Sequence, residues 1–271
     1  MKIVFIGDVM GRSGREAVEK HLPKIRAALD PDVVIVNGEN AANGAGINEK
    51  ICTQLYEAGV NCITLGNHTW SQREIIPYID RDQKLIRPLN YPQATPGNGS
   101  YIFQTAAGQK ILIVNLLTRL FMEPIDDPFA AMDALLKNYK LGRDVSAIFV
   151  DFHGEATSEK MSLGHHLDGR VSAVIGTHTH IPTADYHVMT GGTAFMADAG
   201  MSGDFDSVIG VRKDIGVHRF VKKVPGERMT PAKGEGTMCG VYIETSDKTG
   251  LAKNIQPIRL GGLLSQAMPQ I

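Results

Sequence analysis

The sequence predicts an α/β protein with mixed β-sheets and with helices packed outside them. Two observations carry this prediction. Short runs of apolar, β-branched residues recur along the first two-thirds of the chain, and stretches with helical spacing of apolar positions separate them. Strands that are apolar along their whole length are typical of sheets covered on both faces. The 271 residues are 43% hydrophobic and show no long linker, so we expect one domain over residues 1–271 with a large core.

The N-terminal part of the chain repeats a strand, a polar turn and a helix. Each strand is a run of Val, Ile, Leu or Phe that stops at a Gly, Asn or Asp. Pro23 lies inside the first helical stretch and indicates a kink or break there. The predicted strands of this part are 2–7, 33–36 and 60–65, and the predicted helices are 12–29 and 47–58.

Further strands follow, and the final third of the chain changes character. Residues 84–106 are rich in Pro, Asn and Gly and predict a loop with one short strand. Residues 198–236 hold many Gly, Asp and Lys and predict a long irregular segment. The remaining predicted strands are 111–117, 145–150 and 171–175, and short, partly alternating strands are predicted within 184–197 and 237–260.

Composition excludes several classes of protein. The formal net charge is −1, which argues against stable DNA binding and against attachment to a membrane surface. The three cysteines form no CxxC pair, so we expect buried free thiols. No apolar run reaches the ~18 residues of a membrane span, and the N-terminal sequence lacks the features of a signal peptide. These observations predict a cytoplasmic protein.

Polar side chains of one chemical kind collect where the predicted strands end. Because the carboxyl ends of parallel strands lie along one edge of a sheet, and ligands bind outside that edge, we expect these side chains to meet. Carboxylate, amide and imidazole groups without thiolate indicate Mn, Fe, Zn or Ni. The residues are Asp8, Glu39 and Asn40, Asn67 and His68, His153, and His178 and His180.

Two metal ions about 3.5–4 Å apart can clamp a phosphoryl group and acidify a water between them. Glu39 is the natural candidate for a carboxylate that bridges them. Each residue has a structural alternative when taken alone: Asp8 would cap a helix, Glu39 would belong to a turn, and His153 would pack in the core. The shared position at five strand ends favours the metal site, because mutual geometry identifies a site better than any one residue.

The order of these residues resembles that of the calcineurin-like metallophosphoesterases. Their pattern reads D-x-H, an acidic bridging residue, G-N-H-[DE], a lone His and G-H-x-H. This sequence departs from it at four places. Met10 replaces the His of D-x-H, Glu39 replaces the bridging Asp, Thr69 follows G-N-H, and Thr177 separates Gly176 from the His-x-His pair.

These departures match the YmdB-like bacterial metallophosphoesterases, and the resemblance covers essentially the whole chain. It implies a four-layer metallophosphoesterase fold, in which two mixed β-sheets pack as a sandwich flanked by helices. It also implies a di-iron or related dinuclear centre and phosphodiesterase activity on 2′,3′-cyclic nucleotides. The matching stretches are 7–11 (GDVMG), 37–42 (NGENAA), 66–70 (GNHTW), 155–160 (EATSEK) and 176–180 (GTHTH).

The resemblance further implies a role for each site residue. Asn40 would supply the ligand that the missing His provides elsewhere, and His68 would bind no metal and act as the general acid. The resemblance implies iron first. Met10 leaves the first site richer in oxygen ligands than in the wider superfamily, so Mn, Zn or Ni stay open as alternatives. Asp8, Glu39, Asn40 and His180 would hold the first metal, and Glu39, Asn67, His153 and His178 the second.

The expected reaction is in-line attack of a metal-bridging hydroxide on phosphorus, with His68 protonating the leaving 2′-oxygen to give a 3′-phosphomonoester. The expected binding partner is then a small-molecule substrate, either a cyclic nucleotide or another phosphodiester. The sequence does not decide whether the chain forms a homo-oligomer. Two alternatives remain. One is a phosphatase or 3′,5′-cyclic nucleotide phosphodiesterase at the same site, and the other is a non-enzymatic regulator that binds a nucleotide.

The residues that contact the nucleoside are not fixed by the sequence. Arg119 and Phe121 follow the 111–117 strand, where they could meet phosphate and base, but a surface arginine and a core phenylalanine explain them equally well. Trp70 and Tyr91 could stack on a base, although aromatic packing is the default. The 198–236 segment could cover the cleft or mediate a subunit contact.

Overall fold

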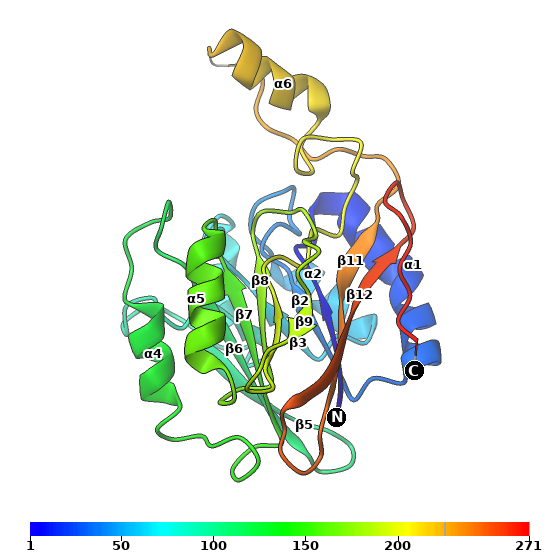
Figure 1. The fold of residues 1–271 in the computed structure, drawn as a ribbon. Coiled ribbons are helices and arrows are strands. Elements are labelled where there is room, and N and C mark those ends of the chain that lie inside the picture. Colours follow the sequence, from blue (N-terminus) through cyan, green and yellow to red (C-terminus); the bar gives the residue numbers. More distant parts are fainter. Residues whose placement is uncertain (225, 271) are drawn as a thin grey trace.

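Two β-sheets pack face to face in the computed structural model, which describes residues 1–224 and 226–270 (Figure 1). The first sheet has the strand order β12 (Ala252–Leu260), β11 (Met238–Thr245), β1 (Lys2–Ile6), β2 (Val33–Asn37), β3 (Cys62–Thr64) and β4 (Leu85–Ile86). Strands β1 to β4 are parallel, whereas β11 is antiparallel to β1 and to β12. The sheet is therefore mixed.

The second sheet is mixed in the same way. Its strand order is β5 (Ser100–Gln104), β6 (Lys110–Leu117), β7 (Ala147–His153), β8 (Ala173–Thr177), β10 (Ala194–Met196) and β9 (His187–Val188). The four central strands are parallel, and the edge strands β5 and β9 are antiparallel to their neighbours.

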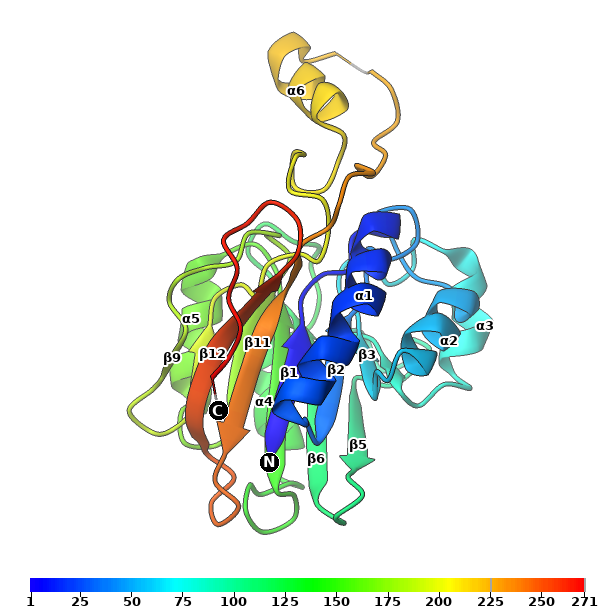
Figure 2. The same cartoon turned by 90° about the vertical axis from the view of Figure 1, so that its right-hand side faces the viewer.

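Helices cover the outer face of each sheet (Figures 1 and 2). The first sheet is flanked by α1 (Gly11–Leu29), α2 (Glu49–Glu57), the 3₁₀ turn η1 (Arg73–Ile75) and α3 (Ile76–Ile79). The second sheet is flanked by α4 (Pro128–Leu135) and α5 (Thr157–Leu167). The layers are thus helix, sheet, sheet and helix, and the predicted fold class is confirmed.

The alternation of side chains along the strands explains the layering. In β1, Val4 and Ile6 pack in the cluster beneath α1, whereas Ile3 and Phe5 pack in a second cluster between the sheets. Phe5 meets Phe149 of β7 across that interface, with ring centroids 4.9 Å apart. A third cluster joins the second sheet to α4 and α5. Because both faces of each sheet are covered, the strands are apolar along their whole length.

Some boundaries differ from those predicted. The expected break at Pro23 is wrong, because α1 runs through it: the proline is exposed, and the neighbouring Leu22 and Ile25 hold the helix on the sheet. β7 includes His153, which was expected beyond the strand end. The 84–106 region holds two short strands, where one was expected, and β11 and β12 are long. Within the described residues, no helix is both long and apolar enough to cross a membrane.

The prediction of an irregular segment at 198–236 is wrong in its middle, which forms α6 (Lys213–Lys222). Figures 1 and 2 both show α6 projecting away from the two sheets. Asp214 in its first turn and Arg219 and Lys222 in its last turn complement the helix dipole. Surrounding glycines and charges concealed this short helix. We refer to residues 204–224 and 226–236 as the arm.

Candidate metal centre

The predicted site residues lie where the ends of the two sheets meet. In the first sheet, Asp8 follows β1, Glu39 and Asn40 follow β2, and Asn67 and His68 follow β3. In the second sheet, His153 is the last residue of β7, and His178 and His180 follow β8. They do not share the edge of one sheet, as the sequence analysis assumed, but come from both sheets of the sandwich. In chain order they are Asp8, Glu39, Asn40, Asn67, His68, His153, His178 and His180.

His153 is fully buried at the middle of this cluster. Its Nε2 atom lies 3.0 Å from Oε1 of Glu39, 3.1 Å from Oδ1 of Asn67 and 3.1 Å from Nδ1 of His178. One imidazole proton cannot serve three acceptors, so lone pairs converge on one small space. The ligating atoms of Glu39, His153 and His178 all lie within 4.8 Å of one another, which suits a single cation.

A second group of ligating atoms surrounds Asn40 and His180. Nδ2 of Asn40 lies 3.0 Å from Nε2 of His180, and a half-turn of the amide would present its oxygen there instead. Asp8 connects this group to the first, because its Oδ2 accepts a hydrogen bond from the backbone N–H of His178 at 3.0 Å. Asp8, Asn40 and His180 therefore lie beside the group formed by Glu39, His153 and His178.

Three buried oxygens of the cluster have no hydrogen-bond partner in the part of the chain that the structure describes. They are Oδ1 of Asp8, Oε1 of Glu39 and Oδ1 of Asn40. Native proteins rarely leave a buried acceptor unpaired, because its desolvation is then uncompensated. Oxygen and imidazole ligands together suit first-row metal ions. The residues present therefore fit a metal site of the kind that the resemblance implies.

The histidine rings are oriented from outside the cluster. Thr177 donates its hydroxyl hydrogen to Oδ1 of Asp151 at 2.6 Å, so its oxygen accepts Nδ1–H of His153 at 2.8 Å. The carbonyl of Ile209, in the arm, accepts Nδ1–H of His180 at 2.7 Å. Each contact turns the Nε2 lone pair of that ring toward the cluster, as metal-ligating histidines require.

His178 is oriented the other way round. Its Nε2 lies 3.4 Å from Oε2 of Glu155, so Nδ1 is the nitrogen that faces His153 and Glu39. His178 and His180 also have positive φ angles of 99° and 70°. Non-glycine residues rarely adopt this conformation, and such strain concentrates at functional sites. The turn after β8 is thus held in a conformation that presents both rings.

Charges in the cluster shift its pKa values in opposite directions. Burial raises the pKa of Asp8 to about 6, although His153 and His180 oppose it. Burial also acts on Glu39, but the His153 ring outweighs it and lowers the Glu39 pKa to about 2. Burial and the neighbouring His153 lower the pKa of His178 to about 3. Glu39 is thus an ionised carboxylate and His178 a neutral imidazole. At His153, burial is outweighed by Glu39 and Asp8, which raise its pKa to about 9, so a metal ion bound there would displace its proton.

Gly66 allows the end of β3 to approach the cluster closely. A Cβ atom at this position would collide with Oε2 of Glu39 and with the ring of His153. Only glycine leaves this space free, because it has no side chain. The next two residues then bring Asn67 and His68 to the site.

His68 lies beside the cluster rather than inside it. Its backbone N–H donates to Oε2 of Glu39 at 3.0 Å, while its Nδ1 lies 3.3 Å from Oγ of Ser71. Among the described residues, His68 is not part of the group of ligating atoms formed by Glu39, His153 and His178.

Several supporting residues escaped the sequence analysis. Lys160 is buried, and its Nζ donates to the carbonyl of Thr177 at 2.7 Å and to Oδ2 of Asp198 at 3.1 Å. Asp198 in turn accepts the backbone N–H and the hydroxyl of Thr179. This pair supports the turn that carries His178 and His180. Lys160 lies in the stretch 155–160 that matched the family, but no neighbouring sequence pattern indicated that Asp198 is its partner.

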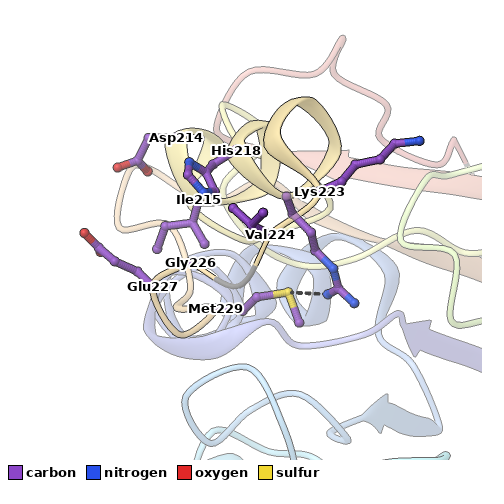
Figure 3. Close-up of a pocket in the computed structure, with 9 residues that line it drawn as sticks. Asp214, Ile215, His218, Lys223, Val224, Gly226, Glu227 and Met229 are labelled. Carbon is purple, nitrogen blue, oxygen red and sulfur yellow. Dashed lines mark hydrogen bonds between the residues drawn. The ribbon is translucent and has the colours of Figure 1, made fainter.

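A cavity in another part of the molecule does not coincide with the cluster. A pocket of about 710 Å³ lies in the arm, between α6 and residues 226–229. Figure 3 shows Met229 beneath α6, and its sulfur accepts a hydrogen bond from Arg219 at 3.3 Å. The pocket contains none of the predicted site residues. The chemistry of the cluster, not cavity size, therefore identifies the functional site.

A sandwich of two mixed sheets, with metal-ligating side chains gathered at the strand ends, defines a metallophosphoesterase. Comparison with known proteins narrows this class. The chain belongs to the YmdB-like protein family, which it matches over residues 4–258. The predicted family is therefore confirmed.

Individual relatives agree with this assignment. A 2′,3′-cyclic-nucleotide 2′-phosphodiesterase of Bacillus subtilis is 44% identical over 258 residues, which cover 95% of this chain and 96% of that protein. A crystal structure described as a hypothetical protein from Thermus thermophilus has a TM-score of 0.90 at 40% identity, covering 97% of this chain and 100% of that one. A phosphatase structure from Mycoplasma pneumoniae has a TM-score of 0.89 at 35% identity, covering 96% and 93%. The prediction that this chain is an enzyme of this class is confirmed.

Proposed function

We propose that this protein is a dinuclear-metal phosphodiesterase that hydrolyses 2′,3′-cyclic nucleotides to 3′-phosphomonoesters. The observation that carries the proposal is the convergence of buried carboxylate, amide and imidazole groups, with three oxygens unpaired and with histidine rings oriented from outside. The substrate follows from the 44% identical relative, which is named for this reaction. We place the activity in the cytoplasm, on a small-molecule substrate.

Two ligand sets share Glu39. When bound, the metal pair would lower the pKa of a water and offset negative charge on the phosphoryl oxygens. Oxygen and imidazole ligands suit Fe, Mn, Zn and Ni alike, and we propose iron among them on the family resemblance. We assign Asp8, Glu39, Asn40 and His180 to the first metal and Glu39, Asn67, His153 and His178 to the second.

His68 is the proposed general acid. Its backbone N–H is bonded to Glu39, which keeps the residue beside the cluster, and we place its ring next to the bound phosphate without making it a ligand. Ser71 lies within reach of Nδ1, which leaves Nε2 to face the substrate. A protonated Nε2 can donate its proton to the leaving 2′-oxygen as the P–O bond breaks, and the product keeps its phosphate on the 3′-oxygen.

A second candidate function is phosphomonoester hydrolysis at the same centre. It is favoured by the name of the Mycoplasma pneumoniae relative, which is a phosphatase. A substrate panel separates the two: 2′,3′-cyclic AMP, 3′,5′-cyclic AMP, 5′-AMP and a phosphopeptide, with the same metal-loaded protein. We expect the first to be turned over at least about 10-fold more efficiently, which corresponds to ~1.4 kcal/mol of transition-state discrimination. Preferential release of phosphate from 5′-AMP or the phosphopeptide would instead favour the phosphatase.

The same panel tests a purely regulatory role. A non-enzymatic nucleotide receptor would bind 2′,3′-cyclic AMP tightly and leave it unchanged after long incubation with metal-loaded protein. Binding measured by calorimetry, together with product analysis by chromatography, distinguishes this outcome from catalysis.

A further inference from the structure

The loop between β6 and α4, residues 118–127, is anchored at both ends next to the proposed metal centre. At its base, the buried Asn90 accepts the backbone N–H of Leu117 at 2.9 Å and donates to the carbonyls of Leu117 and Asp126 at 2.8 and 2.9 Å. One side chain therefore closes the loop where it leaves and rejoins the body of the protein. Closed loops of this kind are frequently functional.

A second anchor holds the beginning of the loop. The carboxylate of Glu159, on α5, accepts the backbone N–H of Arg119 at 2.9 Å and that of Leu120 at 2.9 Å. Figure 1 shows this segment rising beside α5. On that side, Leu120 and Met122 line a pocket of about 530 Å³ between the loop and α5. Phe121 is not among the residues that line this pocket. The loop is thus braced rather than free.

The base of the loop is directly connected to a proposed metal ligand. Leu117 pairs with His153 across β6 and β7, and the backbone N–H of the next residue, Thr118, donates to the carbonyl of His153 at 2.9 Å. Three residues span at most about 10 Å, so Phe121 lies within about that distance of Thr118, which is bonded to the backbone of His153. A nucleotide bound through its phosphate at that centre extends over a comparable distance.

Phe121 itself is unusual in two respects. Its side chain is 87% exposed, which contradicts the alternative of a core phenylalanine. Its φ angle is 63°, in the left-handed region that bulky residues rarely adopt. A braced loop therefore holds a large aromatic ring in solvent at the expense of backbone strain. Strain of this kind indicates a functional constraint on the residue.

We propose that Phe121 stacks on the nucleobase of the substrate and determines the preference for nucleotides over other phosphodiesters. The inference rests on the proposed function of the metal centre. An exposed aromatic face binds every base, because each base offers a π face, so the stacking would be tolerant of base identity. Arg119, which begins the same loop, instead pairs with Asp127 at 3.8 Å and lines the pocket against α5.

The test compares Phe121→Ala, Phe121→Trp and a control, Phe220→Ala, whose ring is also exposed but lies on α6. The substrates are 2′,3′-cyclic AMP and methyl ribofuranoside 2′,3′-cyclic phosphate, which lacks a base. We expect Phe121→Ala to raise KM for 2′,3′-cyclic AMP about 5- to 100-fold, the range of base–aromatic stacking. The base-free substrate should be unaffected, kcat should change little, and Phe121→Trp should retain tight binding.

Three results would overturn the inference. They are an unchanged KM in Phe121→Ala, an equal loss on both substrates, and a rise in KM that is accompanied by a change of oligomeric state in light scattering. If the wild-type protein hydrolyses neither substrate, the proposed function fails. Calorimetric binding of 3′-AMP to wild type and Phe121→Ala then still decides the stacking, because equal affinities would contradict it.

Discussion

At the scale of single residues, the centre depends on groups that orient other groups. Thr177 fixes the ring of His153, Ile209 fixes that of His180, and Gly66 leaves space for Glu39. None of the three would itself bind metal in our assignment. Ligating histidines generally depend on such outer partners, whose loss costs about 10- to 100-fold in metal affinity or activity.

The variant His68→Ala distinguishes a general acid from a metal ligand. We expect kcat to fall by about 10²–10⁴, the usual contribution of a general acid, with the metal content unchanged. The exposed His187 provides the control His187→Ala, which should keep full activity. Loss of metal from His68→Ala, measured by elemental analysis, would place His68 among the ligands and contradict its assignment.

Glu39→Gln tests the bridging role. Because Glu39 belongs to both proposed ligand sets, its replacement should deplete both metals and abolish activity. Glu57→Gln, at an exposed position on α2, should leave metal content unaffected. A Glu39→Gln protein that retains its full metal complement, by elemental analysis, would show that Glu39 bridges nothing.

Thr177→Val tests the orientation of His153. Valine has a similar volume but accepts no hydrogen bond from Nδ1, and it leaves Asp151 without one of its donors. We expect metal affinity to fall about 10- to 100-fold. Competition with a chromogenic chelator measures this, and Thr177→Ser, which keeps the hydroxyl, should restore most of the affinity. An affinity equal to that of wild type in Thr177→Val would contradict the role.

At the scale of elements, the turn after β8 depends on the helix beside it. Lys160 of α5 forms a buried ion pair with Asp198, and both bond to the turn that carries His178 and His180. Removing one partner of a buried pair leaves the other charge uncompensated. Helix α5 therefore helps to shape the metal centre without contributing a ligand.

Lys160→Met tests this dependence. We expect it to destabilise the protein by about 3–5 kcal/mol, because Asp198 remains buried and charged. Metal binding should weaken as well, since the turn loses a support. Urea denaturation measures the free energy of unfolding, with the exposed Lys137→Met as the control. Equal stability of the two variants would show that the pair does not hold the turn.

The elements also show what the sequence could and could not predict. Strand positions and ligand residues were predictable, because apolar runs and the polar residues that end them are local patterns. The partner of Lys160 was not predictable, since Asp198 lies 38 residues away. Helix α6 was missed because it buries only Ile215 and Gly216, so its sequence lacks the regular apolar spacing that revealed α1 and α2.

At the scale of the whole molecule, the site exists because two sheets pack together. Asp151 of β7 accepts hydrogen bonds from Asn37 of β2 and Thr64 of β3, so a buried carboxylate joins the sheets beneath the centre. The sequence indicated that the strand ends meet, but it did not show that they belong to opposite sheets. Which strands pair is decided by contacts distant in sequence, which periodicity alone does not contain.

The central claim is that these strand ends hold two metal ions for phosphodiester hydrolysis. The most direct test is the metal content of protein purified without added metal, together with hydrolysis of 2′,3′-cyclic AMP before and after chelation. We predict about two metal ions per chain, mainly iron, and an activity that chelation abolishes and metal restores. One metal or none, with an activity that chelation does not change, would contradict the claim.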